Sequence, residues 1–157
     1  MSTRQFYTIL FIGFLSLISS FPLTTRAQVS SPAVPEAVTE EEVRLFIDDY
    51  TKRFTKMDLE AYMDLFSSEA VENRALPYAD IRVAYQRTIQ GSHSIQYDVK
   101  IYTIQTYARS AFASGRYQIT QTLKGGRVRT FKGNIQWALA REGRALKIKE
   151  INYGIDH

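Results

Sequence analysis

The hydrophobic pattern of this chain changes period once, and that change constrains the fold more than any other feature. Before Ser94, apolar residues recur at spacings of three and four, whereas after it they recur at every second position over long runs. The first spacing is typical of amphipathic helices and the second of strands with one buried face. The sequence therefore predicts three helices followed by four long strands, which is an α+β arrangement.

Start and stop signals define the predicted helices. Thr39 and Glu42 form a capping box before the first helix, and Asp58 caps the second. Pro77 suits the first turn of the third helix, which Gly91 ends. The three apolar stripes consist of Val43, Phe46, Ile47, Tyr50 and Phe54, then Leu59, Tyr62, Met63 and Phe66, then Ile81, Ala84, Tyr85, Thr88 and Ile89.

The strand region contains two predicted irregularities. In the first long strand, the alternating apolar positions change from odd to even residue numbers between Ile101 and Tyr102. In the last strand, they change in the same way from even to odd near Lys149-Glu150. Each strand should therefore carry a bulge. Gly125-Gly126 and Glu142-Gly143 predict the tight turns between strands. Upstream, residues 67–76 show no clear period and leave room for one short strand.

The N-terminal segment predicts export. Arg4 precedes an apolar run from Phe6 to Leu23, and Thr25-Arg26-Ala27 offers a cleavage site, so residues 1–27 are interpreted as a signal peptide. An uncleaved anchor is the alternative, because the apolar run approaches the roughly 20 residues that span a bilayer. Residues 28–38 are predicted to be a flexible linker and residues 39–157 the folded domain.

The residue inventory excludes several kinds of chemistry. The chain has no cysteine, so a disulfide, a thiolate metal site and a cysteine nucleophile are impossible. It also has no Asn-x-Ser/Thr glycosylation sequon, so nothing points to a eukaryotic secretory route. We expect a bacterial periplasmic or secreted protein that is not attached to the membrane after cleavage.

Charge is distributed unevenly along the chain. Residues 36–80 hold twelve acidic and five basic residues, whereas residues 81–157 hold four acidic and thirteen basic residues. A basic half can attract an anionic partner, but strand positions that face water produce the same composition. Because no phosphate-binding or nucleic-acid motif accompanies the charge, we favour a solvated sheet and expect no nucleic-acid partner.

Three segments carry a resemblance to a known family. They are Phe46-Ile47-Asp48-Asp49-Tyr50, the run from Lys56 to Phe66 (KMDLEAYMDLF), and Ala145-Leu146-Lys147-Ile148-Lys149-Glu150-Ile151. Together they resemble the nuclear transport factor 2-like superfamily and are similar to its SnoaL-like branch and to periplasmic domains fused to cell-wall transpeptidases. The resemblance implies a cone-like fold, in which a curved antiparallel sheet wraps around N-terminal helices and a pocket opens between them. It also implies dimers formed through the outer sheet face.

Catalytic candidates are few. Enzymatic relatives place an aspartate in the pocket, often with a tyrosine or histidine, and the residues that come nearest to this pattern are Asp80 and His93. Asp80 suits the first turn of a helix equally well, and His93 is placed in a turn, where a polar surface role is the common one. The other histidine, His157, ends the chain. We expect no metal site and no cofactor.

Aromatic residues supply the predicted pocket lining. Four aromatic side chains fall on or beside the apolar stripes of helices and strands, namely Tyr50, Tyr62, Tyr85 and Tyr97, and the late strands add Trp137, Asn152 and Tyr153. Such side chains give a pocket an aromatic wall with a hydroxyl rim. The same residues could instead fill a small core completely.

Two functions fit this pattern. We favour an exported, non-enzymatic binding or accessory domain that holds a small apolar or amphipathic ligand, or a segment of an envelope protein. The alternative is a small-molecule isomerase, dehydratase or cyclase with an acid-base residue in the pocket. A homodimer is expected through the sheet face that carries Arg116, Gln118, Thr120, Lys132, Asn134 and Gln136.

Overall fold

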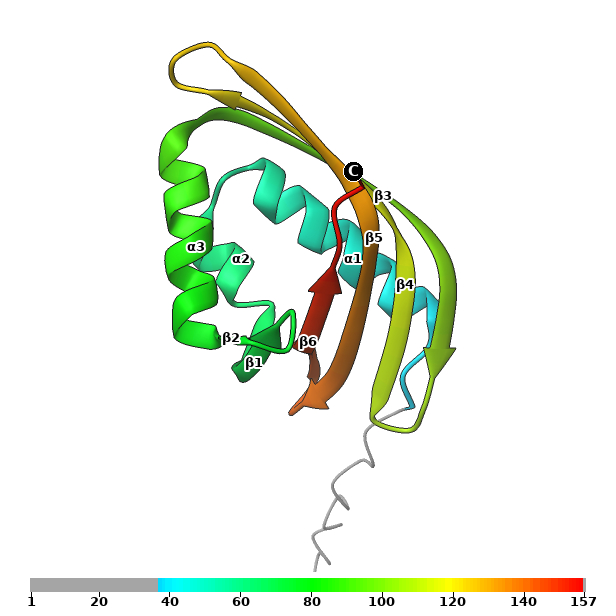
Figure 1. Cartoon of the computed structure of the whole chain (residues 1–157). Helices are drawn as coiled ribbons and strands as arrows, with labels where there is room; N and C mark the ends of the chain where they lie inside the picture. Colours follow the sequence, from blue (N-terminus) through cyan, green and yellow to red (C-terminus); the bar gives the residue numbers. More distant parts are fainter. Residues whose placement is uncertain (1–36, 157) are drawn as a thin grey trace, which may run out of the picture. The chain divides into compact units, whose positions relative to one another are not determined.

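The structure, a computed structural model, describes residues 37–156, and every structural statement below concerns this part of the chain. The predicted signal peptide and most of the predicted linker lie outside it, as does His157. The elements are α1 (Glu40–Thr55), α2 (Leu59–Met63), β1 (Phe66–Glu72), β2 (Leu76–Pro77), α3 (Tyr78–Gly91), β3 (Ser92–Thr106), β4 (Ser110–Leu123), β5 (Val128–Glu142) and β6 (Ala145–Tyr153) (Figure 1). Their order confirms the predicted three helices and four long strands.

The first helix starts at its predicted N-cap, Thr39, whereas the Glu42 carboxylate pairs with Arg141 instead of closing the predicted capping box. The Thr39 hydroxyl accepts a hydrogen bond from the Glu42 amide at 3.1 Å. Val38, which the sequence assigned to the flexible linker, is only 4 % exposed and belongs to the same hydrophobic core as Val43. Apolar residues on either side of an N-cap commonly pack together and fix the direction of chain entry. The folded domain therefore begins before Thr39, and the predicted linker boundary was wrong at Val38.

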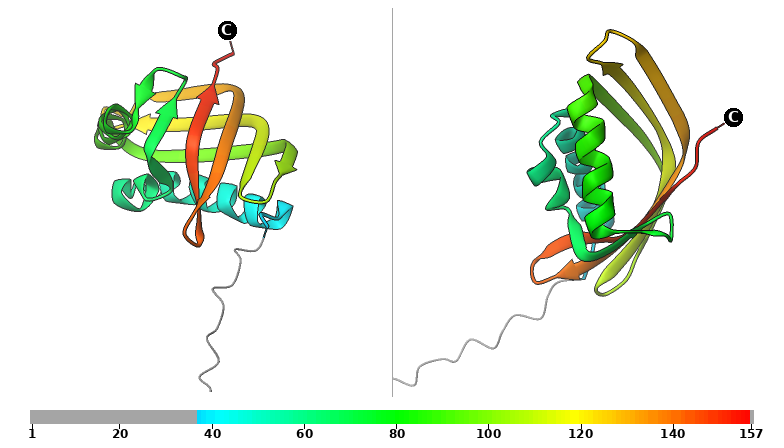
Figure 2. Two further views of the ribbon diagram at one scale, coloured as in Figure 1. Left: turned by 90° about the horizontal axis from the view of Figure 1, so that it is seen from below. Right: turned by 60° about the vertical axis from the view of Figure 1, so that its left-hand side comes forward.

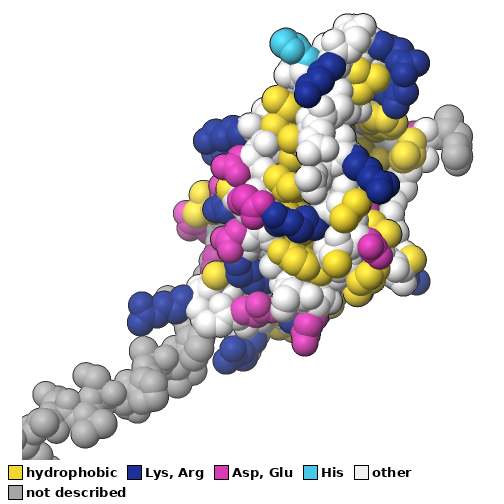
Figure 3. All heavy atoms as spheres, turned by 90° about the vertical axis from the view of Figure 1, so that its left-hand side faces the viewer, with side chains coloured by type: hydrophobic (Ala, Val, Ile, Leu, Met, Phe, Trp, Pro, Cys, Tyr) yellow, Lys and Arg dark blue, Asp and Glu magenta, His cyan; other side chains and the backbone are white. Residues whose placement is uncertain are grey.

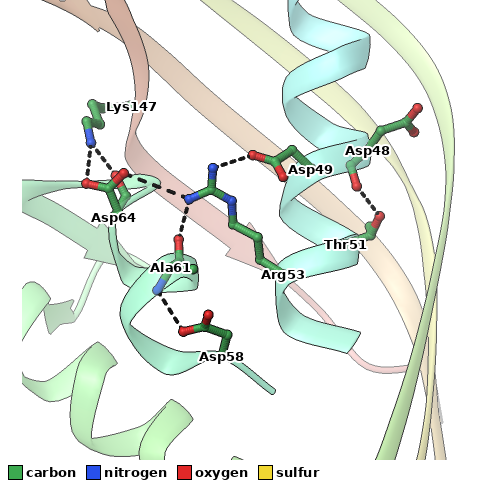
Figure 4. Close-up of polar contacts among 8 residues, drawn as sticks. All are labelled: Asp48, Asp49, Thr51, Arg53, Asp58, Ala61, Asp64 and Lys147. Carbon is green, nitrogen blue, oxygen red and sulfur yellow. Dashed lines mark hydrogen bonds and ion pairs between the residues drawn. The ribbon is translucent and has the colours of Figure 1, made fainter. Parts of the chain in front are cut away.

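Arg53 joins the two helices at the corner that the sequence predicted (Figure 4). Its guanidinium lies 2.7 Å from the Asp49 carboxylate on its own helix and donates to the Ala61 carbonyl of α2 at 2.6 Å. Asp58 caps α2 by accepting from the Ala61 amide at 3.1 Å. Asp64, at the end of α2, lies 3.1 Å from the Lys147 ammonium of β6, which ties this corner to the sheet.

One mixed sheet contains all six strands, in the order β2-β1-β6-β5-β4-β3. The four long strands pair antiparallel, as predicted. The short strand β1 runs parallel to β6, with Phe66 opposite Ile148. Parallel pairing requires a long connection, and here α3 and the three long strands β3 to β5 supply it.

Two bulges bend the sheet where the change of parity predicted them. In β3, Ile101 and Thr103 face consecutive residues of β4, so Tyr102 is the extra residue. In β6, Lys149 is extra in the same way against β5. Gly115 lies opposite the first bulge, where a side-chain carbon would approach the Lys100 carbonyl oxygen to 2.4 Å. Figure 2 shows the long strands curving around the helices, which confirms the cone-like α+β fold.

The core lies between the helices and the inner face of this curved sheet. Val43 and Ile47 of α1 are buried, as are Trp137, Ile148 and Ile151 of β5 and β6. Alternate residues of the strands, such as Lys132, Asn134 and Gln136, are exposed on the outer face. The helices therefore cover one face of the sheet and leave the other open.

Candidate functional site

A cavity of about 480 Å³ lies between the helices and the inner face of the sheet. The C-terminal half of α1, the helix α3 and strands β3 to β6 all contribute to its wall. Seven aromatic side chains line it, namely Tyr50, Phe54, Tyr85, Tyr97, Tyr117, Phe131 and Tyr153. Ile119, Leu123 and Ile155 add aliphatic surface. The cavity is thus mainly apolar, with phenol hydroxyls as its chief polar groups.

Hydrogen bonds connect the tyrosines to one another and to the backbone. The hydroxyls of Tyr50 and Tyr97 lie 3.3 Å apart, which joins α1 to β3. The Tyr117 hydroxyl donates to the Gly154 carbonyl at 3.1 Å and so holds the segment after β6 against β4. These bonds fix the ring orientations, because each phenol is tied at its outer end while its ring packs against neighbours.

A buried carboxylate stands behind the tyrosine wall. Glu72, the last residue of β1, is 5 % exposed. Its two oxygens accept hydrogen bonds from Tyr85 at 2.9 Å and from Tyr153 at 2.7 Å. No ion pair connects Glu72 to a basic side chain within residues 37–156. A buried carboxylate is costly to desolvate, and the two phenol donors compensate only part of that cost.

Burial shifts the ionisation of the tyrosines. It raises the pKa of Tyr85 well above its ordinary value, and the nearby Glu72 carboxylate adds to the shift. Burial likewise raises the pKa of Tyr153, and the hydrogen bond to Glu72 acts in the same direction. Burial also raises the pKa of Tyr50 and of Tyr97 well above the usual range. These four tyrosines of the cavity wall are therefore neutral phenols at physiological pH.

A second series of linked hydrogen bonds reaches the cavity from the end of α3. The Gln121 amide group donates to the Ser92 hydroxyl at 2.8 Å, and that hydroxyl donates to the Thr88 carbonyl at 2.6 Å. Gln121 and Thr88 both line the cavity. This series satisfies buried polar groups where helix α3 passes directly into β3.

The predicted lining residues separate into two groups. Tyr50, Tyr85, Tyr97 and Tyr153 line the cavity, whereas Tyr62, Trp137 and Asn152 do not. Tyr62 is fully buried beside the rings of Tyr50 and Phe54, at centroid distances of 5.2 and 4.9 Å. Trp137 belongs to the filled part of the core, where its ring meets the edge of Tyr50.

Asn152 lies on the opposite face of the sheet. It pairs across strands with the exposed Gln136 and donates to the Glu150 carboxylate at 2.7 Å. With Gln136 and Glu150 it borders a separate depression on the outer face. Asn152 therefore does not line the pocket as the sequence predicted, because the bulge at Lys149 turns its side chain outward.

The two catalytic candidates from the sequence do not reach the cavity. Asp80 is exposed in the first turn of α3, and His93 is exposed near the start of β3. Neither lines the cavity. His93 is also not in a turn, because β3 begins at Ser92, directly after the helix.

Sequence reasoning missed Glu72. The short strand β1 has an irregular burial pattern, and the parallel register with β6 shifts between Phe66 and Val71, so no clean alternation marks its inner face. One signal was present: Glu72 is two residues after the buried Ala70 and therefore shares its face. An acidic residue at an inward position of a strand indicates buried hydrogen-bond partners.

Comparison with known proteins gives matches at the level of structure alone. No family model matches the chain, and no curated protein does. A nuclear transport factor 2-like superfamily protein from Salmonella enterica superposes with a TM-score of 0.65 at 18% identity, covering 74% of this chain and 90% of that one. A proposed aromatic ring hydroxylase from Novosphingobium aromaticivorans gives 0.66 at 15% identity, with 74% and 88% coverage.

A proposed dehydratase of the same fold family from Streptomyces avermitilis superposes with a TM-score of 0.64 at 11% identity, covering 74% of this chain and 95% of that one. The chain has the nuclear transport factor 2-like fold. This confirms the resemblance found in the sequence. Identities this low establish a shared architecture and leave function to be argued from the site itself.

Between residues 37 and 156, no group of three or more acidic or histidine side chains is placed to hold a metal ion. In the same range, no helix is both long and apolar enough to cross a membrane.

Proposed function

We propose that this nuclear transport factor 2-like domain binds a small, largely apolar molecule in the tyrosine-lined cavity. The observation that carries the proposal is the cavity itself, whose volume of about 480 Å³ falls within the range of about 300–1,000 Å³ typical of small-molecule sites. Concave, mainly apolar sites of this size with a few polar groups are the usual form of small-molecule sites.

The wall suits a flat or branched apolar ligand with a few polar atoms. Aromatic faces bury much surface and favour edge or stacked contacts with rings. The phenol oxygens and the Gln121 side chain provide hydrogen bonds at separate points of the wall. Such an arrangement orients a ligand through a small number of polar contacts while apolar burial supplies affinity.

A variant that fills the cavity tests this proposal. Leu123→Trp adds an indole at the cavity wall, and Val128→Trp adds the same group at a position that is 58% exposed and outside the cavity. The probe is N-phenyl-1-naphthylamine, a neutral naphthalene whose fluorescence rises in apolar sites. We expect Leu123→Trp to weaken binding by about tenfold or more and Val128→Trp to leave it unchanged. Equal binding by all three proteins would exclude the cavity as the site.

Acid-base catalysis is the second candidate, and Glu72 is the observation that favours it. A carboxylate within hydrogen-bond reach of groups that line a pocket can act as a general acid or base. Tyr85 and Tyr153 connect Glu72 to the cavity wall, so a proton could pass between a bound molecule and this carboxylate through a phenol. An isomerase, dehydratase or cyclase would use such a group.

Turnover separates the two candidates. A metabolite extract of the host is incubated with the wild type and with Glu72→Gln, and substrates and products are followed by mass spectrometry. An enzyme consumes a metabolite with the wild type only, whereas a binding domain retains the same metabolite with both proteins. A metabolite consumed equally by both would remove Glu72 from the chemistry.

We also propose that the chain is exported to the periplasm or secreted. The support is the apolar run from Phe6 to Leu23 after Arg4 in the sequence. Intact-mass measurement of the protein recovered from its host tests this. Loss of about 27 residues is expected from the predicted cleavage site. A full-length mass in the membrane fraction would favour an anchor instead.

The outer face of the sheet is proposed as a homodimer interface. Arg116 and Asn134 are opposite each other there, as are Gln118 and Lys132, so a row of polar side chains faces outward. Light scattering at micromolar concentration should give a dimer mass, and Asn134→Arg should give a monomer by adding a like charge beside Arg116 and Lys132. A monomeric wild type would contradict the proposal and leave this face free for an envelope protein.

A further inference from the structure

Two arginines lie at the cavity without a counter-ion. Arg87 of α3 and Arg129 of β5 both line it, and both are exposed. A backbone hydrogen bond of 3.1 Å between the Lys124 amide and the Gly91 carbonyl holds the end of α3 against the β4–β5 hairpin, which brings the two elements together. Among the residues that the structure describes, none that lines the cavity is acidic. The cationic side chains therefore face its opening without neutralisation from its own wall.

Most other arginines of the domain are paired. Six of them form ion pairs with carboxylates, namely Arg44, Arg53, Arg74, Arg82, Arg116 and Arg141. Within residues 37–156, neither Arg87 nor Arg129 forms one. Figure 3 shows Lys and Arg side chains at the upper end of the surface that it draws, and a mixture of basic and acidic side chains over the middle and lower parts.

Two tyrosines of the same cavity have the opposite hydrogen-bonding character. Tyr85 and Tyr153 donate their protons to Glu72, so their oxygens can only accept hydrogen bonds from a ligand. The buried charge of Glu72 behind them also repels an anion. Guanidinium groups, in contrast, only donate, and they bind carboxylates and phosphates in a matching fork geometry. The cavity therefore offers two kinds of polar group to a ligand. The arginines donate hydrogen bonds and attract an anion, whereas the two phenol oxygens beside Glu72 only accept hydrogen bonds.

We propose that the ligand is an amphipathic organic anion, bound with its apolar body among the tyrosines and its acidic group between Arg87 and Arg129. This inference rests on the proposed binding function and adds the chemical class and orientation of the ligand. Long-range attraction by these arginines also raises the local concentration of such an anion. Added salt weakens that attraction.

Two fluorescent probes that differ by one acidic group test the inference. One is 8-anilino-1-naphthalenesulfonate, and the other is N-phenyl-1-naphthylamine, which has the same rings without the sulfonate. The test variant is Arg87→Gln with Arg129→Gln, and the matched control is Arg127→Gln, an exposed arginine of the same hairpin that does not line the cavity. Affinities are measured by fluorescence titration at low and high salt.

We expect the double variant to weaken binding of the sulfonate about tenfold at low salt, to leave the neutral probe within about twofold, and to remove most of the salt dependence. Arg127→Gln should bind both probes like the wild type. Unchanged sulfonate affinity in the double variant would overturn the anion assignment while leaving the cavity intact. Failure of both probes to bind the wild type would overturn the binding function itself.

Discussion

The space between the helices and the sheet is filled along the first half of α1 and hollow along its second half. At the filled end, Val43 and Ile47 are almost completely buried together with Trp137, Leu139 and Ile148. At the hollow end, Tyr50 and Phe54 of the same helix face a cavity of about 480 Å³. One helix and one sheet thus form two different interiors.

The difference lies in the side chains rather than in the backbone. Branched aliphatic residues and Trp137 interdigitate at the filled end, as close-packed cores do. At the hollow end, phenols are tied at their hydroxyls, Tyr50 to Tyr97 and both Tyr85 and Tyr153 to Glu72. Rings held at both ends cannot collapse inward. We infer that the hydrogen-bonded tyrosines form a frame that keeps the cavity open.

Alkaline pH should lower the free energy of unfolding more than either of the substitutions below, and it should act through the tyrosines of the hollow end. Three tyrosines of the hollow end, Tyr50, Tyr85 and Tyr97, have pKa values raised well above 10.0 in the fold, chiefly by burial. Their contribution is complete below pH 10 and is lost as the pH rises further, because the unfolded chain then releases protons that the fold retains. Each phenol lowers the free energy of unfolding by up to about 1.4 kcal/mol per pH unit.

The measurement is urea unfolding followed by circular dichroism at pH 8, 10 and 11, together with phenolate absorbance. We expect several kcal/mol to be lost by pH 11, a large part of the roughly 5–15 kcal/mol typical of a domain. As the pH rises, the native protein should show less phenolate absorbance than the urea-unfolded chain at the same pH, until the fold is lost. A native protein with fully ionised tyrosines at pH 11 would show that water already reaches the frame.

Truncation of the filled end should have the next largest effect. Trp137 is 1 % exposed, and Trp137→Ala should cost about 3–5 kcal/mol of unfolding free energy, as loss of a buried aromatic side chain usually does. Phe131→Ala, on the same strand but beside the cavity, should cost less, because part of its surface already meets empty space. Urea unfolding at neutral pH measures both.

Phe112→Ala is the control for these truncations, since Phe112 is 52% exposed on the same sheet. It should change stability by less than about 1 kcal/mol. Equal losses for Trp137→Ala and Phe131→Ala would mean that the two interiors are packed alike, and the contrast between the filled and hollow ends would then fail.

Periodicity predicted the elements well because helix and strand repeats depend on local sequence. Even the bulges at Tyr102 and Lys149 were visible as a change of parity. The parallel pairing of β1 with β6 could not be predicted from the sequence pattern. It joins residues about 80 positions apart, and β1 has no clean alternation of apolar and polar residues. Nothing in the local pattern of such a strand specifies its partner.

The site was harder to predict than the fold for a physical reason. Parity indicates that Tyr50, Tyr85, Tyr97 and Trp137 point inward, but it cannot distinguish a wall of a cavity from a packed core. That distinction depends on how closely α1 and α3 approach the sheet. Glu72 was missed for a related reason, since its partners Tyr85 and Tyr153 come from two other elements.

Removing one hydroxyl from the frame should lower stability less than alkaline pH or the truncation of Trp137. Tyr153→Phe deletes the 2.7 Å hydrogen bond to Glu72 and leaves one buried carboxylate oxygen without that donor. Hydrogen bonds to charged groups contribute about 1.5–3 kcal/mol, so we expect a loss in that range by urea unfolding. Tyr107→Phe, in a side chain that is 52% exposed, should cost less than about 0.5 kcal/mol.

A double-mutant cycle shows whether that loss belongs to the frame. If Tyr153 acts through Glu72, then Tyr153→Phe should cost much less in a Glu72→Gln background than in the wild type, because the charge that needs the donor is gone. Equal costs in both backgrounds would assign the effect to ring packing at the cavity wall. In that case the phenols would be lining residues only, and the cavity would owe its opening to the backbone rather than to the hydrogen-bonded frame.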